Sequence, residues 1–105
     1  MSYVLAVYEY NGEFYGGIYN SWRDYYNATF SPEYETVFCY DFTTKGKTYS
    51  DRKAYVQNFA IGWSNIVCLM KNDFSYGEWG VVESEFRRLG KQYGLLREFA
   101  INCIC

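Results

Sequence analysis

The chain has 105 residues, of which half are hydrophobic, with a formal net charge of -2 and one proline. This length suits one domain, and the apolar content is enough for a core without disulfide or metal staples, which excludes a disordered or low-complexity chain. Aromatic residues make up 23% of the chain and include 13 tyrosines. We therefore expect many tyrosine rings at the surface, where they suit recognition, or half-buried on sheet faces.

The first ten residues carry no basic segment and already alternate like a strand, so we expect no targeting signal. No apolar run approaches the ~18 residues that a membrane span needs. The sequence thus predicts a cytoplasmic protein without a membrane partner. In that compartment we expect reduced thiols at the four cysteines. These are Cys39, Cys68, Cys103 and Cys105.

A β-hairpin is predicted at the start of the chain. Residues 3–10 and 14–19 are rich in β-branched and aromatic side chains, and Asn11-Gly12 between them suits a tight turn. Gly16-Gly17 inside the second strand indicates a bulge or the close approach of another backbone.

The next segment, residues 21–30, allows two structures: a short helix capped by Ser21, or an aromatic loop bearing Trp22, Tyr25 and Tyr26. Residues 34–43 then alternate as a third strand. The alternation puts Tyr34, Thr36, Phe38 and Tyr40 on one face and Val37, Cys39 and Asp41 on the other. Residues 45–47 make the following turn.

Helical periodicity occurs twice between residues 50 and 94. The first apolar stripe runs from Val56 to Met70, with Ser50 as the expected N-cap and Asp51 in the first turn. Gly62 leaves open a break followed by a strand at 66–70, but we favour the long helix because its stripe continues in phase.

The second stripe runs from Trp79 to Tyr93. Ser75 and Glu78 have the spacing of a capping box, and Gly94 suits the C-cap. Joined by residues 71–74, the two helices would form an antiparallel pair. The tail from 95 to 105 fits either a strand or a helix.

These elements predict a single α+β domain. An N-terminal antiparallel β-sheet, made of the hairpin plus the third strand, would pack on the C-terminal helical pair. A C-terminal strand in the tail would extend the sheet.

Residue types for catalysis are missing from the sequence. Without histidine the chain lacks the commonest general base and zinc ligand, and its cysteines lack the C-x-x-C spacing of a zinc knuckle. No glycine-rich phosphate loop is present either. We therefore expect no catalytic residue, metal or cofactor, and a protein that is not an enzyme.

Charge is divided along the chain. Residues 1–44 hold six acids and one base, a net charge of -5, whereas residues 45–105 hold nine bases and six acids, a net charge of +3. Such a division can produce a dipolar surface that orients charged partners, although two solvated faces would give the same pattern.

The basic half offers one cluster that could hold nucleic-acid phosphates. It comprises Arg87, Arg88, Lys91 and Arg97. The competing interpretation is a solvated helix face on which Glu83 and Glu85 pair with the bases. The isoelectric point of about 5.0 favours this second interpretation.

Four segments of the C-terminal half resemble small proteins carried by bacterial phages and conjugative elements. They are GKTYSDRK at 46–53, AIGWSN at 60–65, SYGE at 75–78 and GKQYGLLREF at 90–99. As a short, acidic, tyrosine-rich chain without histidine, the whole sequence is also similar to phage anti-CRISPR proteins. The resemblance implies a stoichiometric inhibitor acting in the cytoplasm of a bacterial host cell, on a CRISPR effector nuclease.

Such nucleases hold nucleic acid in basic channels, which an acidic, aromatic surface could occupy by mimicking phosphates and bases. The acidic half supplies the candidate partner-binding residues. They are Glu9, Glu13, Tyr15, Asp24, Tyr25, Tyr26, Glu33, Tyr34, Glu35 and Asp41. The alternative function is a nucleic-acid-binding accessory protein of a mobile element that uses the basic face of the second helix.

Overall fold

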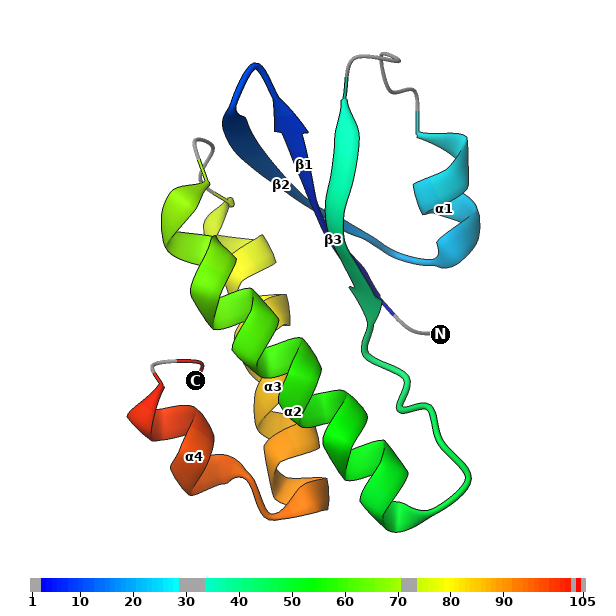
Figure 1. The fold of residues 1–105 in the computed structure, drawn as a ribbon, viewed down its shortest axis with the longest axis vertical. Coiled ribbons are helices and arrows are strands. Elements are labelled where there is room, and N and C mark those ends of the chain that lie inside the picture. The colour runs from blue at the N-terminus through cyan, green and yellow to red at the C-terminus, as the bar shows by residue number, and fades with distance from the viewer. Residues whose placement is uncertain (1–2, 29–33, 71–73, 103, 105) are drawn as a thin grey trace.

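The computed structural model describes residues 3–28, 34–70, 74–102 and 104. A three-stranded antiparallel sheet with strand order β2-β1-β3 occupies one end of the 38 Å long axis. Helices α2 and α3 lie on one side of the sheet and extend beyond it, α1 lies on the other side of the sheet, and α4 lies alongside the far ends of α2 and α3 (Figure 1). The predicted α+β architecture is confirmed.

The hairpin is formed by β1, Val4–Tyr10, and β2, Glu13–Tyr19. Its turn residues Asn11 and Gly12 both have positive φ angles, 52° and 77°, as their types predict. Gly16 marks a close approach rather than a bulge, because a Cβ there would collide with the Met70 sulfur and lie 3.1 Å from the Phe74 ring. The approaching groups are side chains and not backbone.

Strand β3, Glu35–Asp41, pairs with β1, and its predicted strict alternation is wrong. Val7 pairs with Phe38 but Tyr8 pairs with Thr36, so Val37 is an extra residue at a bulge. The bulge moves Thr36 onto the face of Tyr8, away from the face that Phe38 and Tyr40 share.

Helix α1, Trp22–Asn27, resolves the alternatives for residues 21–30 in favour of a short helix. Ser21 is its N-cap and accepts a hydrogen bond from the Asp24 amide at 3.2 Å. The segment therefore presents its aromatic side chains on one helical turn rather than in a loop. Residues 29–33, which include Glu33, lie outside the described residues.

Helix α2, Tyr49–Ile66, begins two residues earlier than the expected cap at Ser50 implies, because its cap lies two residues before Ser50. Thr48, and not Ser50, caps it by accepting from the Asp51 amide at 3.1 Å. Gly62 does not break the helix. A Cβ there would lie 3.0 Å from the Phe38 ring, so the glycine allows β3 to pack closely against α2.

The helix does not reach Met70 as predicted. A single 3₁₀ turn, Val67–Leu69, follows α2, and Met70 is extended and pairs with Phe14 of β2. The apolar stripe continues because these residues still pack on the core, although the backbone is no longer α-helical.

Helix α3, Tyr76–Tyr93, has both predicted ends: the Ser75 and Glu78 capping box, and Gly94 with φ 67°. The tail forms α4, Leu96–Ile101, so the alternative of a fourth strand is wrong. Leu95, Phe99 and Ile104 are buried there, at most 9% exposed, and this burial selects the helix.

The main core lies between the sheet and α2 and α3. The Phe59 ring lies 4.8 Å from Phe86 and 4.9 Å from Tyr40, and Phe42 lies 5.1 Å from Phe86, measured between ring centroids. Strand β1 is buried on both faces, with Val4 to Tyr8 at most 5% exposed. The face of β1 opposite this core is the one that α1 covers.

Candidate interaction surface

Aromatic rings gather on the sheet face that α1 covers, here called the outer aromatic face. Its members are Tyr8, Tyr10, Tyr15, Tyr19, Trp22, Tyr25, Tyr26 and Tyr34. They come from β1, β2, α1 and the residue before β3, because cross-strand neighbours share a face. Four of the predicted tyrosines, at 15, 25, 26 and 34, are therefore brought to one surface.

Ring contacts order the outer aromatic face into two groups. Near the hairpin turn, Tyr34 stacks on Tyr10 at 4.7 Å and meets Tyr15 edge-on at 6.4 Å. Over α1, Trp22 stacks on Tyr26 at 5.8 Å. Tyr26 is 75% exposed and Tyr34 is 38% exposed, so both groups offer ring surface to a partner.

Hydrogen bonds fix the deeper part of the same face. The Tyr8 hydroxyl donates to the Tyr19 hydroxyl at 3.0 Å, and the Tyr25 and Thr36 hydroxyls lie 3.2 Å apart. Burial raises the pKa of Tyr8 and of Tyr25 above the usual tyrosine range, so both rings stay neutral near pH 7. The exposed rings therefore pack on a layer of hydrogen-bonded, uncharged tyrosine side chains.

Asp41, one of the predicted partner-binding acids, is only 3% exposed and serves the fold. Its carboxylate accepts from the Trp22 indole N–H and from the Thr43 amide at 3.0 Å, and the Lys45 ammonium lies 3.7 Å away. The Tyr55 hydroxyl donates to its backbone carbonyl at 3.1 Å. Asp41 therefore joins β3 to α1 and α2 and is not offered to a partner.

The other predicted acids separate into two places. Glu13 lies beside the outer aromatic face, where its carboxylate accepts from the Tyr15 hydroxyl at 2.8 Å and raises the pKa of that tyrosine. Glu9 and Glu35 face each other across β1 and β3, on the same side of the sheet as Phe14. Asp24 is exposed on α1.

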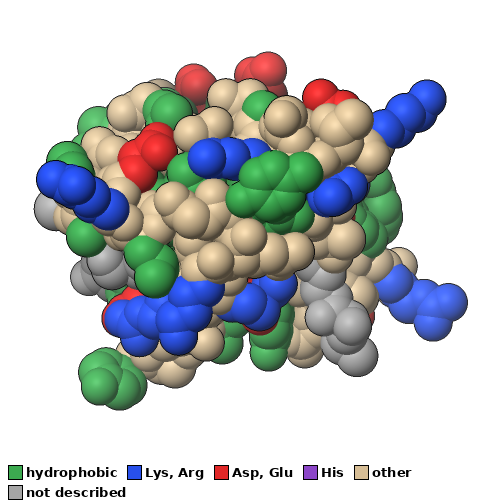
Figure 2. Space-filling view, turned by 90° about the horizontal axis from the view of Figure 1, so that it is seen from below, with side chains coloured by type: hydrophobic (Ala, Val, Ile, Leu, Met, Phe, Trp, Pro, Cys, Tyr) green, Lys and Arg blue, Asp and Glu red, His purple; other side chains and the backbone are tan. Residues whose placement is uncertain are grey.

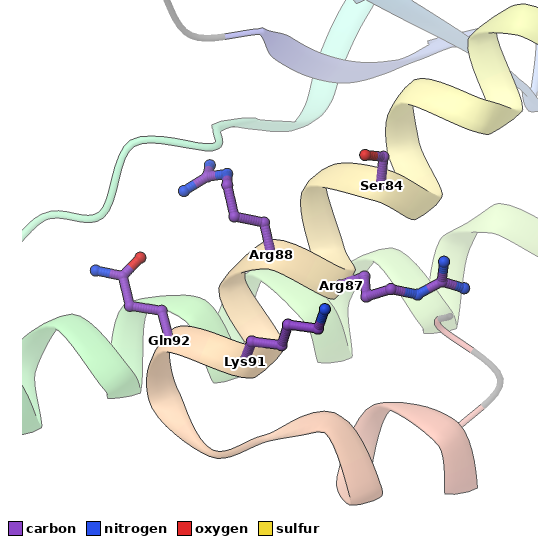
Figure 3. A pocket seen from close by; sticks show the side chains of 5 residues that line it. All are labelled: Ser84, Arg87, Arg88, Lys91 and Gln92. Atoms are coloured by element: carbon purple, nitrogen blue, oxygen red, sulfur yellow. The ribbon is translucent and has the colours of Figure 1, made fainter.

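The predicted basic residues do not form one site. Arg87, Arg88 and Lys91 line an open groove on α3 together with Ser84 and Gln92, here called the basic groove (Figure 3). Its volume is about 600 Å³. Arg97 lies on α4 and does not line the groove.

Two of these bases are paired as the solvated-face interpretation predicts. Arg87 contacts Glu83 at 2.6 Å and Arg88 contacts Glu85 at 2.7 Å. Arg88 also donates to the Phe42 carbonyl at 3.1 Å, which ties α3 to the end of β3. Both arginine side chains remain 52% exposed, so the pairs leave them accessible.

Some residues of these surfaces were missed by sequence reasoning. Tyr10 belongs to the outer aromatic face. Its position opposite Glu13 in the predicted hairpin could have indicated this, because paired residues share a face. Ser84 and Gln92 line the basic groove at helical spacing from Arg88. As polar residues without charge they carry no signal of their own.

Comparison with protein families, with curated proteins and with solved structures finds no match for this chain. Within the described residues no helix is long and apolar enough to span a membrane. In the same part of the chain, no three carboxylate or thiol side chains are placed to hold a metal ion.

Proposed function

We propose that this chain is a non-catalytic binding protein that occupies a basic surface of a protein partner with its outer aromatic face. The observation that carries the proposal is the group at the hairpin end, where Tyr34 stacks on Tyr10 and meets Tyr15 edge-on beside the Glu13 carboxylate. Exposed aromatic rings held rigid by neighbours lose little entropy on binding, which suits an interface anchor.

The distribution of charge also supports binding of the outer aromatic face to a basic surface. Glu13 lies beside the rings at the hairpin end and Asp24 is exposed on α1, whereas Glu9 and Glu35 lie on the opposite side of the sheet and do not line the face. Rings that can replace bases and carboxylates that can replace phosphates would suit a channel that normally holds nucleic acid. An RNA-guided effector nuclease of a bacterial host is therefore the proposed partner, in line with the resemblance to anti-CRISPR proteins.

The proposal is tested by adding the purified protein to a panel of RNA-guided nucleases and measuring cleavage of target DNA. We expect stoichiometric inhibition of at least one nuclease, with a complex measurable by calorimetry. Cleavage that stays unchanged across the panel, with no complex formed, would contradict the proposed partner.

Substitutions on the face then locate the interface. Tyr34→Ala and Tyr26→Ala should each weaken the complex by about 2 kcal/mol, roughly 30-fold in Kd, if the rings are anchors. Tyr76→Ala is the matched control, because Tyr76 is 96% exposed on α3 and makes no ring contact with the described aromatic residues. An equal effect of all three substitutions would place the interface elsewhere.

A further inference from the structure

The described residues that line the basic groove are all polar or charged. Ser84, Arg87, Arg88, Lys91 and Gln92 all come from one exposed side of α3, and Figure 3 shows Arg88 and Arg87 reaching out on either side of Lys91. None of these described residues has an apolar side chain that could anchor a peptide side chain or a lipid tail. Its chemistry is that of an anion site.

Its charge remains positive after the ion pairs are counted. Three cationic side chains line the groove, and the two carboxylates that pair with Arg87 and Arg88 do not line it. Within the described part of the chain Lys91 forms no ion pair. Arg88 is held in place from behind by the Phe42 carbonyl, which leaves its guanidinium partly ordered before any ligand arrives.

A second depression of about 330 Å³ shares Ser84 with the basic groove, but Val81 and the Glu85 carboxylate line it as well as Gly77 and Gly80. The cationic lining therefore extends along α3 from Arg87 to Lys91. Arg87 and Lys91 are one turn apart, about 6 Å between their Cβ atoms. Two neighbouring charges of a polyanion can therefore lie over these two turns of α3.

More cations lie at the same end of the molecule. Lys47 is exposed in the loop before α2, and Arg52 and Lys53 occupy the first turns of that helix. Figure 2 looks onto this end and shows more Lys and Arg than Asp and Glu side chains. The acidic isoelectric point arises largely from the sheet, so it does not describe the field here.

We infer that the basic groove binds the phosphodiester backbone of a nucleic acid, with Lys91 and Arg87 on neighbouring phosphates and Arg88 supporting them. The inference is independent of the proposed function, which concerns the outer aromatic face. Direct contact with phosphates would be sequence-independent and strongly reduced by salt.

The test is fluorescence anisotropy with labelled 20-nucleotide single-stranded DNA, the same sequence as duplex DNA, and the same sequence as RNA, each at 50 and 200 mM salt. We expect micromolar binding to at least one of them at 50 mM. For a single strand the slope of log affinity against log salt should be about -1.4, because roughly two phosphates are neutralised. Lys91→Ala should reduce that slope by about 0.7.

Lys91→Glu should weaken binding at least tenfold. Arg23→Glu is its matched control, because Arg23 is an exposed base on α1 and the substitution changes the net charge equally. Circular dichroism and Tm verify that both variants fold. Absence of binding to all three oligonucleotides at 50 mM, equal weakening by both variants, or binding only to anionic phosphatidylserine vesicles would overturn the inference.

Discussion

The carboxylate of Asp41 receives hydrogen bonds from α1 and from the loop that follows β3, while the Tyr55 hydroxyl of α2 lies 3.4 Å from it. A buried carboxylate is tolerated only when such partners replace its water. Trp22 depends on it in turn, because among the described residues the Asp41 carboxylate is the acceptor of the indole N–H. This residue decides how the α1 layer is attached to the rest of the chain.

Asp41→Ala is predicted to lower the free energy of unfolding by about 2 kcal/mol, since it leaves the part-buried Trp22 indole N–H without its acceptor and removes the contact of the Thr43 amide. Urea denaturation followed by circular dichroism measures the loss. Asp24→Asn, at an exposed position, is the control and should change stability by a few tenths of a kcal/mol. A loss below about 1 kcal/mol for Asp41→Ala would mean that water replaces its contacts.

Stability should also fall at alkaline pH. Burial raises the pKa of Tyr8 and of Tyr55 above its value in the unfolded chain, which is about 10. Above pH ~10 the unfolded chain therefore releases protons that the folded chain keeps, and this shifts the equilibrium toward unfolding. Burial also raises the pKa of the Cys39 thiol, whose effect has the same sign and begins near pH ~8.5.

Urea titrations at intervals from pH 7 to 11 test this expectation. Below pH ~9 these tyrosines are protonated in both states, so their titration should not change the free energy of unfolding. Above pH ~10 the free energy of unfolding should decline. Tyr55→Phe should make the decline shallower, because one of the responsible phenols is gone. Tyr76→Phe controls for removing an exposed phenol. The same slope in wild type and Tyr55→Phe would contradict the assignment.

Among the elements, those with local signals were predictable. The hairpin turn needs two positive φ angles that Asn11 and Gly12 supply, and α3 has its capping box and its terminal glycine within a few residues of each end. The first residue of α2 was not predictable from the sequence, because Thr48 and Ser50 are both good N-cap residues. The choice between them depends on the loop at Gly46, where φ is 141°.

Features that depend on tertiary contacts could not be read from the sequence. Val37 forms a bulge although no glycine in this strand indicates one. The bulge moves Thr36 to the outer aromatic face. The apolar residues of the tail fit the period of a strand and that of a helix equally. The packing of Phe99 against Phe86 favours the helix, α4. In the candidate site, the tyrosines were found by composition, but Glu9 and Glu35 lie on the opposite side of the sheet from them.

Two glycines of α3 should respond oppositely to alanine. Gly80→Ala is predicted to raise the free energy of unfolding by about 1 kcal/mol, because Gly80 lies within the helix and nothing lies within 4 Å of a Cβ there. Gly94→Ala should lower it by about 1 kcal/mol, because φ at Gly94 is 67°. Thermal and urea unfolding measure both, and changes of the same sign would contradict the helix boundaries.

On the scale of the whole molecule, β1 belongs to two cores at once. Leu5 and Val7 pack toward α2 and α3, whereas Tyr8 packs under α1. Helix α1 has six residues and none of them is buried, so it lacks the contacts to fold as a separate unit. Loss of either core removes support from the same strand, and this predicts that the chain unfolds as one cooperative domain.

The three tryptophans allow this cooperativity to be measured, because Trp22 lies on the outer aromatic face while Trp63 and Trp79 contact each other at 6.3 Å in the main core. Trp22→Phe leaves reporters only in the main core, and the double variant Trp63→Phe/Trp79→Phe leaves a reporter only on the outer face. Within each variant, the urea midpoint from fluorescence should coincide with the midpoint from circular dichroism. If Trp22 fluorescence changed at a clearly lower urea concentration than the dichroism of the same variant, α1 would unfold separately. The outer aromatic face would then need to order before it could bind, and its affinity would fall in proportion to the ordered fraction.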